Sequence, residues 1–206
     1  MPGPEARPSQ GGIEHFFGRP ALAVAAGLLG SRIACGAVVV ELTEVEAYAG
    51  ESDPASHAFR GPTPRNRVMF GPAGRVYVYL SYGMHHCMNL VCEEAGVAAA
   101  VLLRAGRVVA GAPVARARRN GVGDDALARG PGNLARALGV ALDCTGTTLW
   151  DGPVRWEPAP GAAPSLAGPR VGVSAGADEQ CRLWVAGDAT VSTYRRHAKA
   201  LPTAAT

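Results

Sequence analysis

The pattern of apolar and polar positions predicts a helix, a strand and a hairpin in the first half of the chain. A helix is expected from Pro20 to Leu29, because proline suits a first helical position and the apolar side chains that follow share one face. Gly30 is expected to end it. Alternation from Ala37 to Tyr48 predicts a strand. Arg75 to Val91 predicts a β-hairpin that turns near Tyr82.

The same pattern predicts shorter elements farther along. Val97 to Arg104 is an apolar run typical of a buried strand, and Asn133 is expected to cap a short helix, Leu134–Leu138, that stops at Gly139. Further short strands are expected at Arg170–Val173 and Cys181–Val185. Runs of strands with irregularly placed helices indicate an α+β fold.

One domain accounts for most of the chain. Residues 13–199 are expected to form it, between flexible ends at residues 1–12 and 200–206 that are rich in small residues and proline. Ala49 to Gly74 predicts a long loop, and loops of that length in compact domains are usually functional.

Charge and cysteine content narrow the chemistry. The net charge of +3 does not by itself indicate nucleic-acid binding. Lys199 is the only lysine among 20 basic residues. GC-rich coding would explain this, but it also limits Schiff-base chemistry to Lys199 or the chain's amino terminus. The five cysteines show no zinc-ligand spacing, so we expect reduced thiols and neither a metal nor another cofactor.

The cellular setting follows from what the sequence does not contain. There is no apolar run of about 18 residues and no secretory signal. We therefore expect a soluble, cytoplasmic protein, associated with the nucleoid if bacterial, that acts as a monomer and does not bind membranes.

The strand Thr43–Tyr48 carries the first candidate chemistry. Alternation places Glu44, Glu46 and Tyr48 on one face. A solvated edge strand would show the same charges. Alternatively, two acids and a ring at the mouth of a long loop form a pocket for a flat substrate.

Two further segments add basic and aromatic side chains. The loop contains His57, Arg60, Arg65 and Arg67. Guanidinium groups among turn residues suit phosphate contacts, although surface arginines kept for solubility and a structural histidine would look alike. Tyr82 stands at the hairpin turn, where a ring has nothing to bury it and could act as a wedge between bases.

Four ordered motifs together carry a family resemblance. They are TEVEAY (43–48), SHAFRGPTPRNRVMF (56–70), YVYLSYGMHHCMN (77–89) and VLLRA (101–105). In this order and spacing the chain resembles the alkyladenine (3-methyladenine) DNA glycosylase family, from about Phe16 to Ser192. The resemblance implies a single mixed domain with a curved antiparallel β-sheet, peripheral helices and a protruding β-hairpin. It also implies excision of alkylated or deaminated purines from double-stranded DNA.

The resemblance implies a role for each matching position. Glu46 corresponds to the general base that activates water, and Arg104 to an arginine beside that water and a backbone phosphate. Tyr82 corresponds to the residue that fills the gap in the duplex, and Asn89 to a pocket-floor residue that rejects the 2-amino group of guanine. The flipped base would be sandwiched by Tyr48, His57 and Tyr79.

The chain departs from the family pattern at two places. His85 and His86 replace residues that are often aromatic, and RAGRV (104–108) replaces a more acidic, proline-containing segment. Both leave substrate preference open among N3-methyladenine, N7-methylguanine, hypoxanthine and ethenoadenine.

Three other functions remain to be distinguished. A glycosylase-lyase would use the amino group of Pro2. A sugar hydrolase would use Glu44 and Glu46 as its acid pair, about 6.8 Å apart along the strand. A silent damage-recognition protein would need neither Glu46 nor Arg104.

Overall fold

Strand β2 (Val38–Tyr48) is the centre of the fold. One edge pairs along its length with β5 (Ala99–Ala110). On the other edge, the first half pairs with β1 (Arg32–Cys35) and the second half with β9 (Arg182–Val185). Strand β2 is therefore an interior strand, and the interpretation of Glu44 and Glu46 as charges on a solvated edge is wrong.

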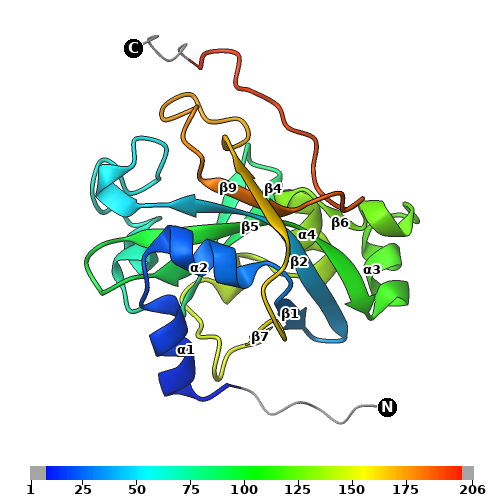
Figure 1. The fold of residues 1–206 in the computed structure, drawn as a ribbon. Helices are drawn as coiled ribbons and strands as arrows, with labels where there is room; N and C mark the ends of the chain where they lie inside the picture. Colours follow the sequence, from blue (N-terminus) through cyan, green and yellow to red (C-terminus); the bar gives the residue numbers. More distant parts are fainter. Residues whose placement is uncertain (1–7, 201–206) are drawn as a thin grey trace.

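The computed structural model describes residues 8–200, and within them an open sheet of nine strands is surrounded by four α-helices (Figure 1). All strand pairs are antiparallel, and the main path runs β3-β4-β5-β2-β1-β7. The other strands are β3 (Val76–Ser81), β4 (His85–Cys92), β6 (Ala128–Arg129), β7 (Val154–Glu157) and β8 (Ser165–Gly168). The helices are α1 (Gln10–Phe17), α2 (Ala21–Leu28), α3 (Ala112–Arg118) and α4 (Pro131–Leu138).

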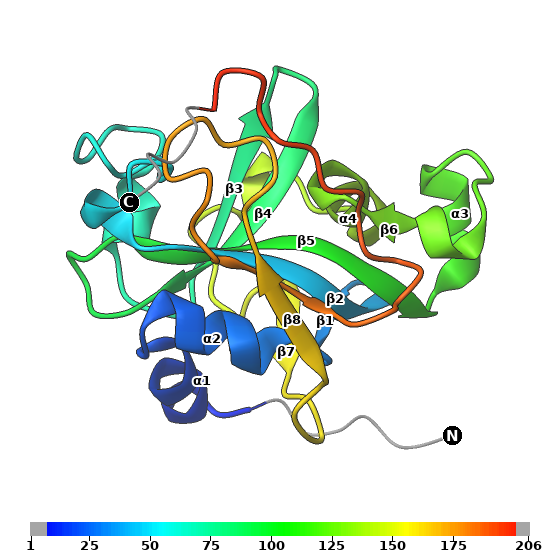
Figure 2. The same cartoon turned by 45° about the horizontal axis from the view of Figure 1, so that its top comes forward.

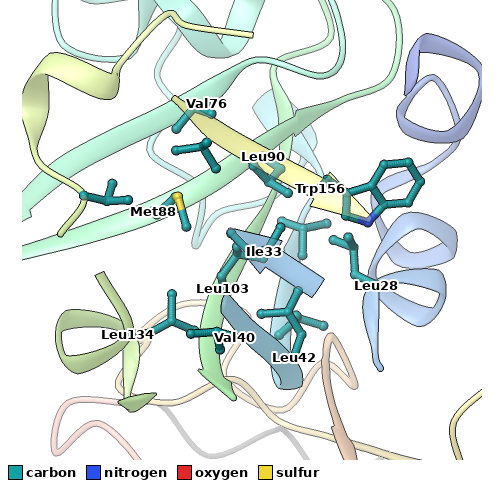
Figure 3. Packing of buried hydrophobic residues seen from close by; sticks show 14 of the residues in the cluster. Leu28, Ile33, Val40, Leu42, Val76, Met88, Leu90, Leu103, Leu134 and Trp156 are labelled. Carbon is teal, nitrogen blue, oxygen red and sulfur yellow. The ribbon is translucent and has the colours of Figure 1, made fainter. Parts of the chain in front are cut away.

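The core lies between the sheet and the helices. Helices α1 and α2 cover one face of the sheet, and the β3–β4 hairpin rises on the opposite side (Figure 2). Figure 3 shows buried side chains from α2, β1 and β7, among them Leu28, Ile33 and Trp156, packed in one cluster with those of the central strands. This packing fixes the sheet that carries the polar residues described below.

The main predicted elements are confirmed. Helix α2, strand β2 and the β3–β4 hairpin lie within one or two residues of their predicted bounds. The α+β class with a protruding hairpin is also confirmed. Strand β5 continues to Ala110, past the predicted end at Arg104.

Several local predictions are wrong. Helix α1 begins at Gln10, inside the expected flexible end, because Ser9 caps it and Ile13 is buried. Residues 171–173 form a turn rather than a strand. Helix α4 starts with Pro131, and Asn133 sits inside it, donating its side-chain amide to the Arg129 carbonyl at 2.7 Å. Residues 1–7 and 201–206 lie outside the described part of the chain.

Candidate active site

A cavity of about 600 Å³ opens where four segments meet. Its walls come from the end of β2, the β3–β4 hairpin with the neighbouring part of β5, the long loop, and residues 171–175. Figure 2 shows the β3–β4 hairpin, the long loop and the segment after β8 on the same side of the sheet. A cavity of this size suits one small organic group, such as a base.

Glu46 places a carboxylate on the cavity wall although its side chain is fully buried from solvent. Oε1 accepts a hydrogen bond from the Val171 backbone N–H at 2.7 Å, and Oε2 accepts one from the Tyr48 hydroxyl at 2.8 Å. Arg104 Nη1 lies 3.4 Å from Oε1. Two hydrogen-bond donors thus orient the carboxylate, and the Arg104 cation stabilises its charge.

Glu44, two residues earlier on β2, has different surroundings. It also is fully buried, but it is absent from the cavity wall. Arg104 Nε donates to its Oε1 at 3.0 Å, and the Ser192 backbone N–H donates to Oε2 at 2.7 Å. Arg182 Nε lies 3.5 Å from Oε1. Glu44 is therefore a buried counter-charge for two arginines.

Arg104 joins the two carboxylates. It projects from β5, opposite β2, and also lines the cavity. Burial opposes its charge, but the Glu46 and Glu44 carboxylates outweigh burial and raise the pKa of Arg104. The guanidinium is consequently a permanent cation beside the Glu46 carboxylate.

Aromatic rings form the cavity walls. The His57 ring meets the Tyr79 ring edge to face, with centroids 4.5 Å apart. Tyr48, the last residue of β2, also lines the cavity. Its pKa is raised mainly by burial and also by the neighbouring Glu46 charge. Burial and the Arg65 charge lower the pKa of His57. At neutral pH, His57 therefore presents a neutral imidazole.

Asn89 also lines the cavity. It stands opposite Tyr77 in the hairpin, is nearly fully buried, and donates from Nδ2 to the Tyr77 carbonyl at 3.2 Å. Tyr77 Oη in turn lies 3.1 Å from His57 Nδ1. These contacts fix both the amide and the imidazole relative to the sheet.

The structure separates the three loop arginines that sequence grouped together. Arg65 lines the cavity, and its guanidinium lies 5.2 Å from the centre of the Tyr79 ring. Arg60 and Arg67 are exposed and lie outside the cavity wall. Buried Asn66 holds this loop by donating to the carbonyls of His57 and Gly61.

Tyr82 occupies the tip of the hairpin. Its side chain is 86% exposed, and its backbone has φ +49, a left-handed conformation unusual outside glycine. Met84, beside it, is 73% exposed. The prediction of an exposed ring at the turn is confirmed, and the turn presents it at the cavity's edge.

Sequence patterns did not identify Arg170 as part of the site. Its side chain is fully buried and pairs with both oxygens of Asp53, with Glu179 at 3.0 Å, and with the Ala47 carbonyl at 3.1 Å. Its guanidinium lies 4.7 Å from the centre of the Tyr48 ring. Val171, which donates to Glu46, is the next residue. The sequence indicated Arg170 only as the first residue of an expected strand, Arg170–Val173.

Ser192 and Arg182 were also missed. Both contact Glu44, from the segment after β9 and from β9 itself. Neither residue belongs to a local pattern that marks chemistry, so only the three-dimensional pairing of β9 with β2 reveals them.

The alternative functions have less support in this geometry. Glu44 is bound by Arg104 and Ser192 and does not line the cavity, so it cannot form a working acid pair with Glu46. Lys199 is exposed and is not on the cavity wall. Pro2 lies outside the described residues. Residues 8–200 contain no helix of the length and apolarity needed to cross a membrane.

Comparison with known proteins identifies the family. A model of the methylpurine-DNA glycosylase family matches residues 15–189. A protein of Cutibacterium acnes is 54% identical over 184 residues, covering 85% of this chain and 96% of its own. One from Nocardia farcinica is 55% identical over 190 residues, covering 87% and 89%, and one from Frankia casuarinae is 50% identical over 193, covering 87% and 91%. All three are named "Putative 3-methyladenine DNA glycosylase". The chain therefore belongs to the methylpurine-DNA glycosylase family and is a monofunctional DNA glycosylase.

Proposed function

We propose that this enzyme flips alkylated or deaminated purines out of double-stranded DNA and hydrolyses their N-glycosidic bond, leaving an abasic site. One observation carries the proposal. A fully buried carboxylate, Glu46, lies on the wall of a base-sized cavity with Arg104 beside it and aromatic side chains around it. The substrates belong to the class of 3-methyladenine, 7-methylguanine, hypoxanthine and ethenoadenine.

Glu46 acts on the sugar side of the bond. As the glycosidic bond breaks, positive charge develops on the sugar, and a nearby carboxylate stabilises it. The same carboxylate accepts a proton from the attacking water. The donors from Val171 and Tyr48 set its direction, and Arg104 lies close enough to help orient the water.

The surrounding residues select and hold the base. Tyr48, His57 and Tyr79 stack on it, and stacking contributes about 1–3 kcal/mol per base. Asn89 on the floor blocks the 2-amino group of guanine. Damaged bases pair poorly, so they flip more easily, which adds selectivity.

The remaining residues act on the duplex. Tyr82 fills the gap left by the flipped base, and the exposed guanidinium groups of Arg60, Arg65 and Arg67 contact phosphates. The enzyme binds DNA as a monomer, without a metal or another cofactor.

Substitution of Glu46 by glutamine tests the proposal. Glutamine keeps the shape but cannot accept the proton, so base release should fall by about 10²–10⁴-fold. A duplex containing hypoxanthine is incubated with excess enzyme, and strand breaks are counted with and without hot alkali. The expected product breaks only after alkali treatment. Affinity for the damaged duplex should stay within about threefold.

Glu94→Gln is a matched control, because Glu94 is exposed and lies on a loop outside the cavity. This variant should release the base at the parent rate. Near-normal single-turnover release by Glu46→Gln would refute the assigned base, and alkali-independent breaks would support a lyase instead.

A further inference from the structure

The C-terminal strap, defined here as residues 186–197, follows β9 and runs back across the molecule past β6 (Figures 1 and 2). Several contacts fasten it. Arg129 of β6 donates to the Ala189 carbonyl, and Thr190 Oγ1 lies 2.7 Å from Thr43 Oγ1 on β2. Farther on, the Arg195 carbonyl accepts a hydrogen bond of 3.0 Å from the Gly172 N–H. The strap thus connects β2 with the segment that lines the cavity.

Ser192 is the point at which this strap reaches the buried charges. Its backbone N–H donates to Glu44 Oε2 at 2.7 Å, and its hydroxyl donates to Glu44 Oε1 at 2.9 Å. The same hydroxyl oxygen accepts from Arg104 Nη2 at 3.3 Å. Since Arg104 Nε also donates to Glu44, these three residues close a ring of hydrogen bonds.

The ring sets the direction of the guanidinium group. A guanidinium is planar, so contacts at three nitrogens fix both its position and its rotation. Nε is held by Glu44, Nη2 by Ser192, and Nη1 is left facing Glu46 at 3.4 Å. Without the hydroxyl, Nη2 loses this partner, and the group is held from only two sides.

We infer that Ser192 is a positioning residue that aims Arg104 at the Glu46 carboxylate, and that the strap is therefore part of the active site. The inference rests on the proposed function, in which Arg104 assists the attack of water. Ser192 lies beyond residue 189, where the match to the family model ends. Ser192 does not itself line the cavity, so its effect passes through Arg104, which does.

Two substitutions of Ser192 separate positioning from folding. Ser192→Ala removes the hydroxyl and leaves the backbone donor to Glu44, whereas Ser192→Thr keeps a hydroxyl. Misplaced catalytic groups can lower rates by up to about 10²-fold. We expect Ser192→Ala to lower the single-turnover release of hypoxanthine about tenfold, with duplex affinity within about twofold of the parent. Ser192→Thr should recover at least about half of the parent rate.

Thr193→Ala is the neighbouring control, because Thr193 is exposed on the same strap. Rates are referred to folded protein, measured by circular dichroism, at a temperature well below each melting point. An unchanged rate in Ser192→Ala, or a folded Ser192→Thr that is as slow as the alanine variant, overturns the inference. Loss of duplex affinity without loss of rate also overturns it. Parallel measurement of Glu46→Gln distinguishes the two proposals, since that variant tests the base alone.

Discussion

Replacement of Arg170 by methionine should destabilise the fold strongly. Methionine fills similar space but leaves the Asp53 carboxylate, which is only 5% exposed, without its bidentate partner. Breaking a buried ion pair by removing one partner costs about 3–5 kcal/mol. For a domain of this size, each kcal/mol lowers the melting temperature by about 2–4 °C. The expected drop is therefore about 6–20 °C.

The structure also predicts how the loss is distributed. Asp53 accounts for most of it, because the other acidic partner, Glu179, has a half-exposed side chain and is screened by water. The melting temperature of Arg170→Lys should lie between those of Arg170→Met and the parent. Lysine keeps the charge, but it cannot bind both Asp53 oxygens at once as the guanidinium does. Base release should fall in both variants, because Arg170 holds the segment whose Val171 N–H donates to Glu46.

Thermal melts followed by circular dichroism measure the effect. Arg116→Met is the matched control, because Arg116 forms a two-nitrogen pair with Asp124 in which both side chains are exposed. Its melting temperature should stay close to that of the parent. If Arg170→Met lowers the melting temperature by less than about 2 °C, the pair with Asp53 is not the stabilising buried contact assigned here.

Two further predictions concern the cavity and the hairpin. Tyr82→Ala should leave the melting temperature nearly unchanged, because the ring is 86% exposed. Its affinity for a lesion-containing duplex, measured at two salt concentrations, should be lower than that of the parent. The dependence of affinity on salt should be the same as in the parent, because Tyr82 makes no phosphate contact. A large decrease in melting temperature with unchanged duplex affinity would refute the proposed role of Tyr82 as a wedge between bases. Asn89→Ser should let unmodified guanine enter and be released, because the shorter side chain no longer fills the floor. Guanine release from undamaged duplex at the parent rate would contradict that role.

The hairpin and the central strand could be predicted because their signals are local. Alternation over Val38–Tyr48 and the aromatic strand before Tyr82 mark strands whatever surrounds them. The end of β5 was missed because Gly106 and Arg107 interrupt the apolar run. The structure explains why residue 106 is a glycine, because a Cβ atom at this position would lie only 2.4 Å from the Glu41 carbonyl oxygen. A glycine inside a strand pattern thus indicated close packing of β2, not the end of the strand.

The cavity residues were predictable to the extent that each belongs to a compact motif. Glu46, Tyr79 and Asn89 all come from motifs in the first half of the chain, and the structure brings them around one cavity. Arg170 and Ser192, which contact Ala47 and Glu44 of β2, lie more than 120 residues away from that strand in sequence. No period or spacing connects residues that far apart, so these contacts follow only from the pairing of β9 with β2.

In the proposed mechanism, the carboxylate of Glu46 acts on the substrate, and the neighbouring carboxylate of Glu44 balances charge. The proposed mechanism places a cation beside Glu46 to orient water, but a buried guanidinium is stable only when its charge is compensated. Glu44 supplies that compensation from the same strand face, two residues away, and Arg182 balances the extra carboxylate. Two carboxylates and two guanidinium groups are then buried together with no net charge. Strand alternation therefore sets the spacing of both the chemistry and the charge balance.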